Sequence, residues 1–184
     1  MEMISKSSIE LIKLVEYFEC GGDVSKYLKP YKCPAGVPTI GLGSTFYEDG
    51  TKVKMTDKPI TKERAYEIFI NTISQYEKAV NSFTRDDINQ YQFDALVDFA
   101  YNAGVNALKN STLLKKVNAN PNDPSILYEF KKWQYAGDGT KNGVDDDGDG
   151  LIDEEGEKKK LQGLANRRSA ESQLYFKKWS IKYT

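Results

Sequence analysis

Apolar residues recur every three or four positions along most of this chain of 184 residues, which is the spacing of helices that bury one face. Thr61 is placed to cap one such segment, whose apolar stripe runs from Ala65 to Val80. Beyond the first helix, the pattern predicts helices at about residues 61–80, 93–104, 111–117, 125–133 and 161–179. The expected fold class is therefore mainly α (α+β).

The first helix is expected to begin beside Ser7, which has capping-box spacing with Glu10. An apolar stripe follows at helical spacing, and the glycine pair at residues 21–22 then stops the helix. This boundary places Glu19 on the last helical turn.

Residues 31–60 differ in character from the rest of the chain. They are rich in glycine, proline and threonine, and Asp49-Gly50 is a hairpin turn signal. We therefore expect a small antiparallel sheet of short strands here, forming a β-hairpin lobe beside a helical lobe. Residues 1–184 are expected to form a single domain.

The chain contains no histidine, and this absence restricts its chemistry. It excludes nucleophilic machinery that depends on histidine and every zinc site with a histidine ligand. The two cysteines, Cys20 and Cys33, are too few for a Cys₄ zinc site, and we expect both to be reduced thiols. Hydrolysis assisted by carboxylates becomes the leading class of chemistry.

The 26 basic and 27 acidic residues nearly balance, so charge gives no indication of a nucleic-acid partner. No apolar run of about 18 residues occurs, and the sequence predicts no membrane anchor. The start of the chain lacks the basic residues and continuous apolar run of a signal peptide, so we expect synthesis in a host cytoplasm. A monomer is expected.

Glu19 is the carboxylate best placed for glycan hydrolysis. That reaction requires an acid to protonate the leaving oxygen, and a group that positions water or a nucleophile. Glu19 lies at a helix end beside flexible glycines, before a hairpin that can wall one side of a cleft. Surface glutamates are common at helix ends, so the spacing alone is only suggestive. Glu16, on the same helix, is the competing candidate.

Two motifs carry a family resemblance. They are F-E-C-G-G at residues 18–22 and Y-x-C-P-A-G-V-x-T-I-G-x-G-x-T at residues 31–45. Together they resemble the active-site signature of phage-type lysozymes, glycoside hydrolase family 24. Further motifs of this family follow in its order at residues 92–104, 111–118, 129–133 and 163–171. The resemblance implies a lysozyme-like fold in which a long helix joins the two lobes. It also implies a phage endolysin that hydrolyses the β-1,4 bond between N-acetylmuramic acid and N-acetylglucosamine in peptidoglycan, acting on the cell wall after release.

The family uses a glutamate, an aspartate and a threonine. Glu19 matches the glutamate and Thr39 the threonine, whereas Cys33 stands at the position of the aspartate. The resemblance implies that Glu19 is the general acid and that Thr39 holds the attacking water, with inversion at the sugar. Cys33 either orients that water or only fills space.

Because Cys33 replaces the second carboxylate, two other functions stay open. A lytic transglycosylase cuts the same bond with one glutamate and no water, although Thr39 in a T-I-G-x-G run argues against it. A non-catalytic wall-binding or calcium-binding module that retains the fold is the other alternative. Reducing-end analysis of digested wall distinguishes all three.

Several other residues are given structural roles. Relatives place the glutamate a few residues closer to the threonine, which predicts an extra loop at residues 21–25. Gly41 and Gly43 are interpreted as turn and bulge glycines. Arg167 and Arg168 are interpreted as a structural clamp on a neighbouring helix.

Residues 138–160 are acidic and glycine-rich, and are interpreted as a loop inserted between two helices. From Asp145 the spacing D-x-D-x-D-G matches the start of an EF-hand-type loop, and such dense carboxylates repel one another without a cation. The ligands predicted are Asp145, Asp147, Asp149, Leu151 through its carbonyl, Asp153 and Glu154. The expected cofactor is a structural Ca²⁺, with none for catalysis. A solvated acidic loop is the alternative.

Overall fold

The computed structural model describes residues 6–33, 35–136 and 159–178. Its helices are α1 (Ile9–Cys20), the 3₁₀ helix η1 (Val24–Tyr27), α2 (Lys62–Phe83), α3 (Gln90–Ala103), α4 (Val105–Asn110), α5 (Thr112–Ala119), α6 (Ile126–Lys131) and α7 (Gln162–Tyr175). Its strands are β1 (Tyr31–Lys32), β2 (Pro38–Thr39), β3 (Tyr135–Ala136) and β4 (Lys159–Lys160). The mainly helical fold with a small sheet is thus confirmed. Within these ranges no helix is long and apolar enough to cross a membrane.

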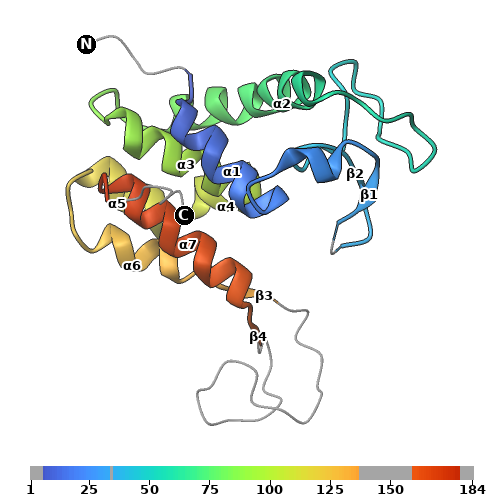
Figure 1. Ribbon diagram of the computed structural model, residues 1–184. Coiled ribbons are helices and arrows are strands. Elements are labelled where there is room, and N and C mark those ends of the chain that lie inside the picture. The colour runs from blue at the N-terminus through green and yellow to red at the C-terminus, as the bar shows by residue number, and fades with distance from the viewer. Residues whose placement is uncertain (1–5, 34, 137–158, 179–184) are drawn as a thin grey trace.

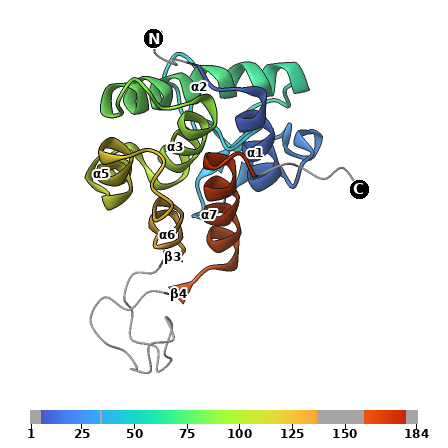
Figure 2. The ribbon, with the colours of Figure 1, turned by 90° about the vertical axis from the view of Figure 1, so that its left-hand side faces the viewer.

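Helix α3 lies at the centre of the molecule, between α2 and α7 (Figures 1 and 2). Its residues 92–100 are all buried, including two aspartates, Asp94 and Asp98. Helix α2 is the long helix that leads from the β1–β2 region to α3 (Figure 1). Thr61 caps it as predicted, since its hydroxyl accepts a hydrogen bond from the backbone of Arg64. The core therefore forms around one buried helix, and any charge on α3 must find its partner inside the protein.

Helix α1 is capped by Ser8, so the prediction that Ser7 caps it was wrong by one residue. The Ser8 hydroxyl accepts from the Glu10 backbone and donates to the carboxylate of Asp94 on α3. The Ser7 backbone N–H instead donates to Glu77 on α2, at 2.8 Å. These contacts with α2 and α3, which local spacing cannot reveal, fix the start of α1. Its end was predicted correctly, because Gly21 takes the left-handed conformation there, with φ of 61°.

Strands β1 and β2 form an antiparallel pair in which Tyr31 lies opposite Thr39. Isolated bridges between Ile40 and Ser44, and between Phe46 and Lys52, continue the hairpin region. The small sheet expected within residues 31–60 is therefore present, although its regular strands are shorter than the whole segment.

Other boundaries differ from the sequence prediction. The short helix α4 was not predicted, and α6 ends at Lys131 instead of Trp133. Helix α7 ends at Tyr175, before the predicted end at residue 179. Strands β3 and β4 pair with each other, so they bring together the two ends of the acidic segment. Residues 138–158 of that segment, with every predicted calcium ligand, lie outside the described residues.

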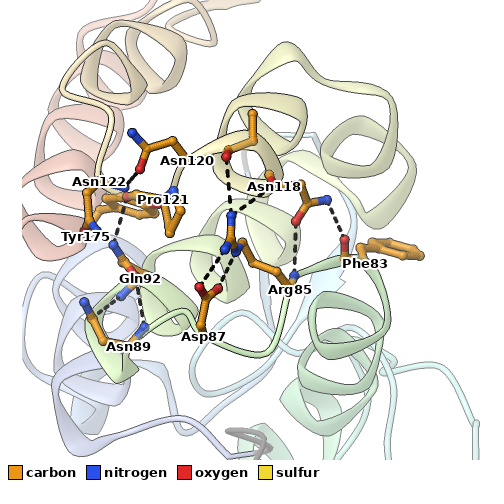
Figure 3. A network of polar contacts seen from close by, with 11 residues as sticks. Phe83, Arg85, Asp87, Asn89, Gln92, Asn118, Asn120, Pro121, Asn122 and Tyr175 are labelled. Carbon is orange, nitrogen blue, oxygen red and sulfur yellow. Dashed lines mark hydrogen bonds and ion pairs between the residues drawn. The ribbon is translucent and has the colours of Figure 1, made fainter. Parts of the chain in front are cut away.

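A polar network fastens the turn between α2 and α3 to the C-terminal end of α5 (Figure 3). The Arg85 guanidinium donates to the carbonyls of Asn118 and Ala119, at 3.2 and 3.4 Å. The Asn118 side chain donates to the Phe83 carbonyl at 2.8 Å. Carbonyls at a helix end lack intrahelical partners, and a guanidinium there satisfies them. The network therefore fixes α5 against α2 and the start of α3.

Candidate active site

A cavity of about 710 Å³ brings together the three residues predicted to be catalytic, Glu19, Cys33 and Thr39. Glu19 comes from the end of α1, whereas Cys33 and Thr39 come from the β1–β2 hairpin. The remaining walls are formed by residues 43–50 and by faces of α2 and α3. The cavity is large enough for sugar rings, and its polar α2 and α3 walls can form hydrogen bonds with them.

The carboxylate of Glu19 is partly buried, with 25% of its side chain exposed. Its Oε1 atom accepts a hydrogen bond from Arg167 Nη1, at 2.5 Å. The Arg167 guanidinium also lies over the Phe18 ring, with its central carbon 5.6 Å from the ring centroid. The contact between α7 and the end of α1 therefore orients Glu19 toward the cavity.

Gly43 lies against the other carboxylate oxygen of Glu19. A Cβ atom added at Gly43 would lie 3.0 Å from Glu19 Oε2 and 3.0 Å from the Tyr101 hydroxyl. Gly43 also has φ of 89°, which other residues rarely adopt. Glycine is therefore required here both by the backbone turn, as predicted, and by the closeness of Glu19.

Arg167 and Arg168 belong to a buried network of charges between α3 and α7. Arg167 holds Asp98 through two hydrogen bonds, of 2.6 Å from Nη2 and 3.0 Å from Nε. Arg168 lies 2.6 Å from Glu171 and donates to Asn102 at 2.7 Å. The predicted clamp on a neighbouring helix is confirmed, and it also reaches Glu19.

Charge in this network is unevenly distributed. Burial acts to raise the pKa of Asp98, but the Arg167 guanidinium outweighs it and holds the pKa below its usual value. Burial raises the pKa of Glu171 well above its usual range, despite Arg168. Asp98 is thus the ionised partner of Arg167, and Glu171 is the carboxyl that tends to keep a proton.

Cys33 and Thr39 lie close together beside the cavity. The Thr39 hydroxyl donates to the Val37 carbonyl at 2.9 Å. Burial acts to raise the pKa of the Cys33 thiol, but hydrogen bonds with Val37, Ala35 and Thr39 outweigh it and lower the pKa. Cys33 therefore has more thiolate character than an isolated cysteine.

Glu16, the competing glutamate, makes its contacts outside the cavity. It accepts hydrogen bonds from the Val24 backbone at 3.1 Å and from the Tyr66 hydroxyl at 3.0 Å. It does not line the cavity. Its role is to hold the turn and 3₁₀ helix that follow α1, where an extra loop was predicted.

Comparison with known proteins identifies the family. The profile of the phage lysozyme family matches residues 25–171. This chain belongs to the phage lysozyme family.

Relatives agree with this assignment. The endolysin of Salmonella phage P22 is 33% identical over 137 residues, which cover 74% of this chain and 87% of the relative. The solved endolysin of Escherichia coli O157:H7 phage FAHEc1 is 29% identical, covers 99% of this chain and 98% of its own, and has a TM-score of 0.76. The muramidase domain of SpmX from Asticaccaulis excentricus is 25% identical, covers 94% of this chain and 98% of its own, and has a TM-score of 0.70. This phage lysozyme is accordingly a lysozyme-like glycoside hydrolase that acts on peptidoglycan.

Both cysteines of this phage lysozyme are free. The Cys20 thiol is buried and lies 3.4 Å from the Gly41 carbonyl. Burial, followed by the charges of Glu19, Glu16 and Asp23, raises the pKa of Cys20 to about 12. In the described ranges no group of three or more Cys, Asp or Glu side chains is arranged to hold a metal ion.

Sequence reasoning missed Asp98 as part of the site. The signal was available, because Asp98 interrupts the apolar run of α3 at a position that the helical period places inside the core. The sequence does not show which residue pairs with Asp98, because its partner Arg167 lies 69 residues away.

Proposed function

We propose that this phage lysozyme hydrolyses the β-1,4 bond between N-acetylmuramic acid and N-acetylglucosamine, with Glu19 as the general acid. The position of Glu19 carries the proposal, because its carboxylate faces the cavity while Arg167 holds it at 2.5 Å. Glu16, which is held by Tyr66 and Val24, lacks such access. A general acid must be held within reach of the leaving oxygen.

In the proposed reaction, Glu19 gives its proton to the glycosidic oxygen as the bond to the anomeric carbon breaks. Thr39 holds a water molecule on the opposite side of the sugar, and that water attacks the anomeric carbon. The configuration is inverted; the attacking water loses one proton to the solvent, and the Glu19 carboxylate takes one proton back from the solvent. Cys33 stands where the family has an aspartate, and its lowered pKa supports a part in orienting the water.

The test is the pair of variants Glu19→Gln and Glu16→Gln. Glutamine keeps the shape of the side chain but cannot donate the proton, so Glu19→Gln should lower wall-clearing activity by about a hundredfold or more. Glu16→Gln should clear wall nearly as well as the wild type. An active Glu19→Gln protein beside an inactive, folded Glu16→Gln protein would reverse the assignment.

A lytic transglycosylase is the second candidate, favoured by Cys33 in place of a carboxylate that would activate water. Its product is a 1,6-anhydro sugar, whereas hydrolysis gives a free reducing sugar. Analysis of the ends released from purified wall therefore separates the two reactions. Absence of any cleavage would leave only a non-catalytic wall-binding or calcium-binding module.

The remaining expectations from the sequence stay proposals. They are a single-domain monomer, synthesis in a host cytoplasm with action on the wall after release, and no nucleic-acid partner. The structural Ca²⁺ is also proposed from the sequence alone, since its ligands, Asp145 to Glu154, lie outside the described residues.

A further inference from the structure

The two oxygens of the Glu19 carboxylate have different surroundings. Oε1 accepts the Arg167 hydrogen bond at 2.5 Å. Oε2 lies beside Gly43, where an added Cβ atom would come within 3.0 Å. Because a guanidinium N–H already points at Oε1, a proton on Glu19 belongs on Oε2.

The orientation of the Arg167 guanidinium is fixed by its hydrogen bonds to Asp98. Asp98 is completely buried in α3 and accepts from both Nη2 and Nε of Arg167. A guanidinium is planar and rigid, so fixing two of its nitrogens fixes the third. That third nitrogen, Nη1, is the one that contacts Glu19.

Asp98 also balances charge. An arginine beside a carboxyl favours its ionised form, and a general acid must keep its proton until it reacts. The negative charge of Asp98 offsets the positive charge of the Arg167 guanidinium, which donates to Glu19. Arg168 contacts Glu171 on its own helix, α7, and Asn102 on α3.

We propose that Asp98 is a positioning residue for the reaction. Acting through Arg167, it fixes Oε1 of Glu19 and leaves Oε2, over Gly43, to deliver the proton to the glycosidic oxygen. This inference rests on the proposed role of Glu19 as the general acid.

Other titratable groups lie near Glu19, and its charge acts on each of them. They are Cys20 in α1, Tyr31 and Cys33 at the hairpin, and Tyr101 in α3. Burial raises the pKa of Cys20, Tyr31 and Tyr101, which keeps them neutral near neutral pH. Cys33 is unchanged in the variants below, so a difference between their pH profiles reports on Asp98.

The first experiment compares Asp98→Asn with the wild type in the pH profile of kcat on purified glycan strands. Removing the charge of Asp98 leaves Arg167 unbalanced, so the alkaline limb should move down by about one pH unit. At the optimum kcat should fall about tenfold, with little change in KM, because the acid is no longer held in place. Asp94→Asn is the matched control, since Asp94 is a buried carboxylate one turn earlier on α3 that binds Ser8. Its alkaline limb should not move.

A second variant tests the role of Glu19 Oε2 and leaves the buried charges of Asp98 and Arg167 in place. Gly43→Ala places a methyl group against Oε2 and should lower kcat about tenfold with little change in KM. Gly104→Ala controls for backbone strain, because Gly104 has φ of 99° with open space around its Cβ position. Thermal melting confirms that each variant is folded.

The outcomes separate the two proposals. Activity in Glu19→Gln would overturn the proposed acid itself. An inactive Glu19→Gln, with a folded Asp98→Asn whose profile and kcat match the wild type, would overturn only the role of Asp98. If Asp98→Asn does not fold, a Gly43→Ala protein as active as Gly104→Ala overturns the assignment of the proton to Oε2.

Discussion

The carboxylate of Glu16 accepts a hydrogen bond from the Tyr66 hydroxyl at 3.0 Å, which ties α1 to α2. The same oxygen accepts from the Val24 backbone at 3.1 Å. Two glutamates of one helix, three residues apart, thus serve different purposes. Glu16 holds the packing of α1, and Glu19 opens to the cavity.

Replacing Glu16 should therefore affect stability and leave catalysis nearly intact. Loss of a hydrogen bond to a charged group costs about 1.5 to 3 kcal/mol, and glutamine retains part of it. We expect Glu16→Gln to unfold at a lower temperature and to clear wall at a rate close to the wild type. Tyr66→Phe, which removes the other partner, should lower the melting temperature in the same direction. Unchanged melting in both variants would contradict this role.

Thr39 and Cys33 should differ in how strongly activity depends on them. If Thr39 holds the attacking water, Thr39→Ala should lose about a hundredfold in kcat. Cys33→Asp, which restores the carboxylate of the family, should be tolerated, and Cys33→Ala shows whether the thiol contributes chemistry or only volume. Rates on purified wall check this. Full activity in Thr39→Ala would exclude the proposed water.

The two thiols should react at very different rates with iodoacetamide. The pKa of Cys33 is lowered, because hydrogen bonds outweigh its partial burial. The pKa of Cys20 is raised to about 12 by burial and by neighbouring carboxylates. The thiolate is the reactive form, so peptide mass spectrometry should find Cys33 alkylated first, with activity lost in parallel. Preferential labelling of Cys20 in folded protein would refute this order.

Glu129 should make stability depend on pH below neutrality. Burial acts to raise its pKa, but Lys116 and Lys132, both 2.9 Å away, lower it. A carboxyl whose pKa is lowered in the folded state stabilises the fold at pH values above its pKa in the unfolded chain. This contribution is lost as the pH falls through its pKa in the folded protein. Since both lysines are partly exposed, Glu129→Gln should cost about 1 to 2 kcal/mol near neutral pH. Urea unfolding at pH 7 and at pH 3 measures this. The difference from the wild type should be smaller at the lower pH.

Calcium should stabilise the protein without taking part in the reaction. The motivation is the D-x-D-x-D-G spacing that starts at Asp145. An ion at about 100 times its dissociation constant adds about 2.7 kcal/mol to stability. EGTA should therefore lower the melting temperature by several degrees, and Mg²⁺ should restore it poorly. Identical melting curves with and without chelator, in protein first shown to be loaded, would leave only a solvated loop.

Much of the helical framework could be read from local patterns. The stripe after Thr61, the glycines that end α1 and the turn-rich segment 31–60 each specify their structure within a few residues. The active-site motifs are equally local, since Cys33 and Thr39 lie in one hairpin. For these features the sequence was sufficient because the determining interactions are short in range.

Tertiary structure decided the rest, because its determining contacts join distant residues. Asp94 on α3 selects Ser8 over Ser7 as the cap of α1, across 86 residues. Arg167 donates to Glu19 across 148 residues, and Tyr66 donates to Glu16 across 50 residues. These long-range contacts place Glu19 at the cavity and Glu16 outside it. Burial makes an unpaired charge costly, so each of these charged groups must have a partner in the interior. The resulting pairs between α1, α3 and α7 fix the geometry of the site.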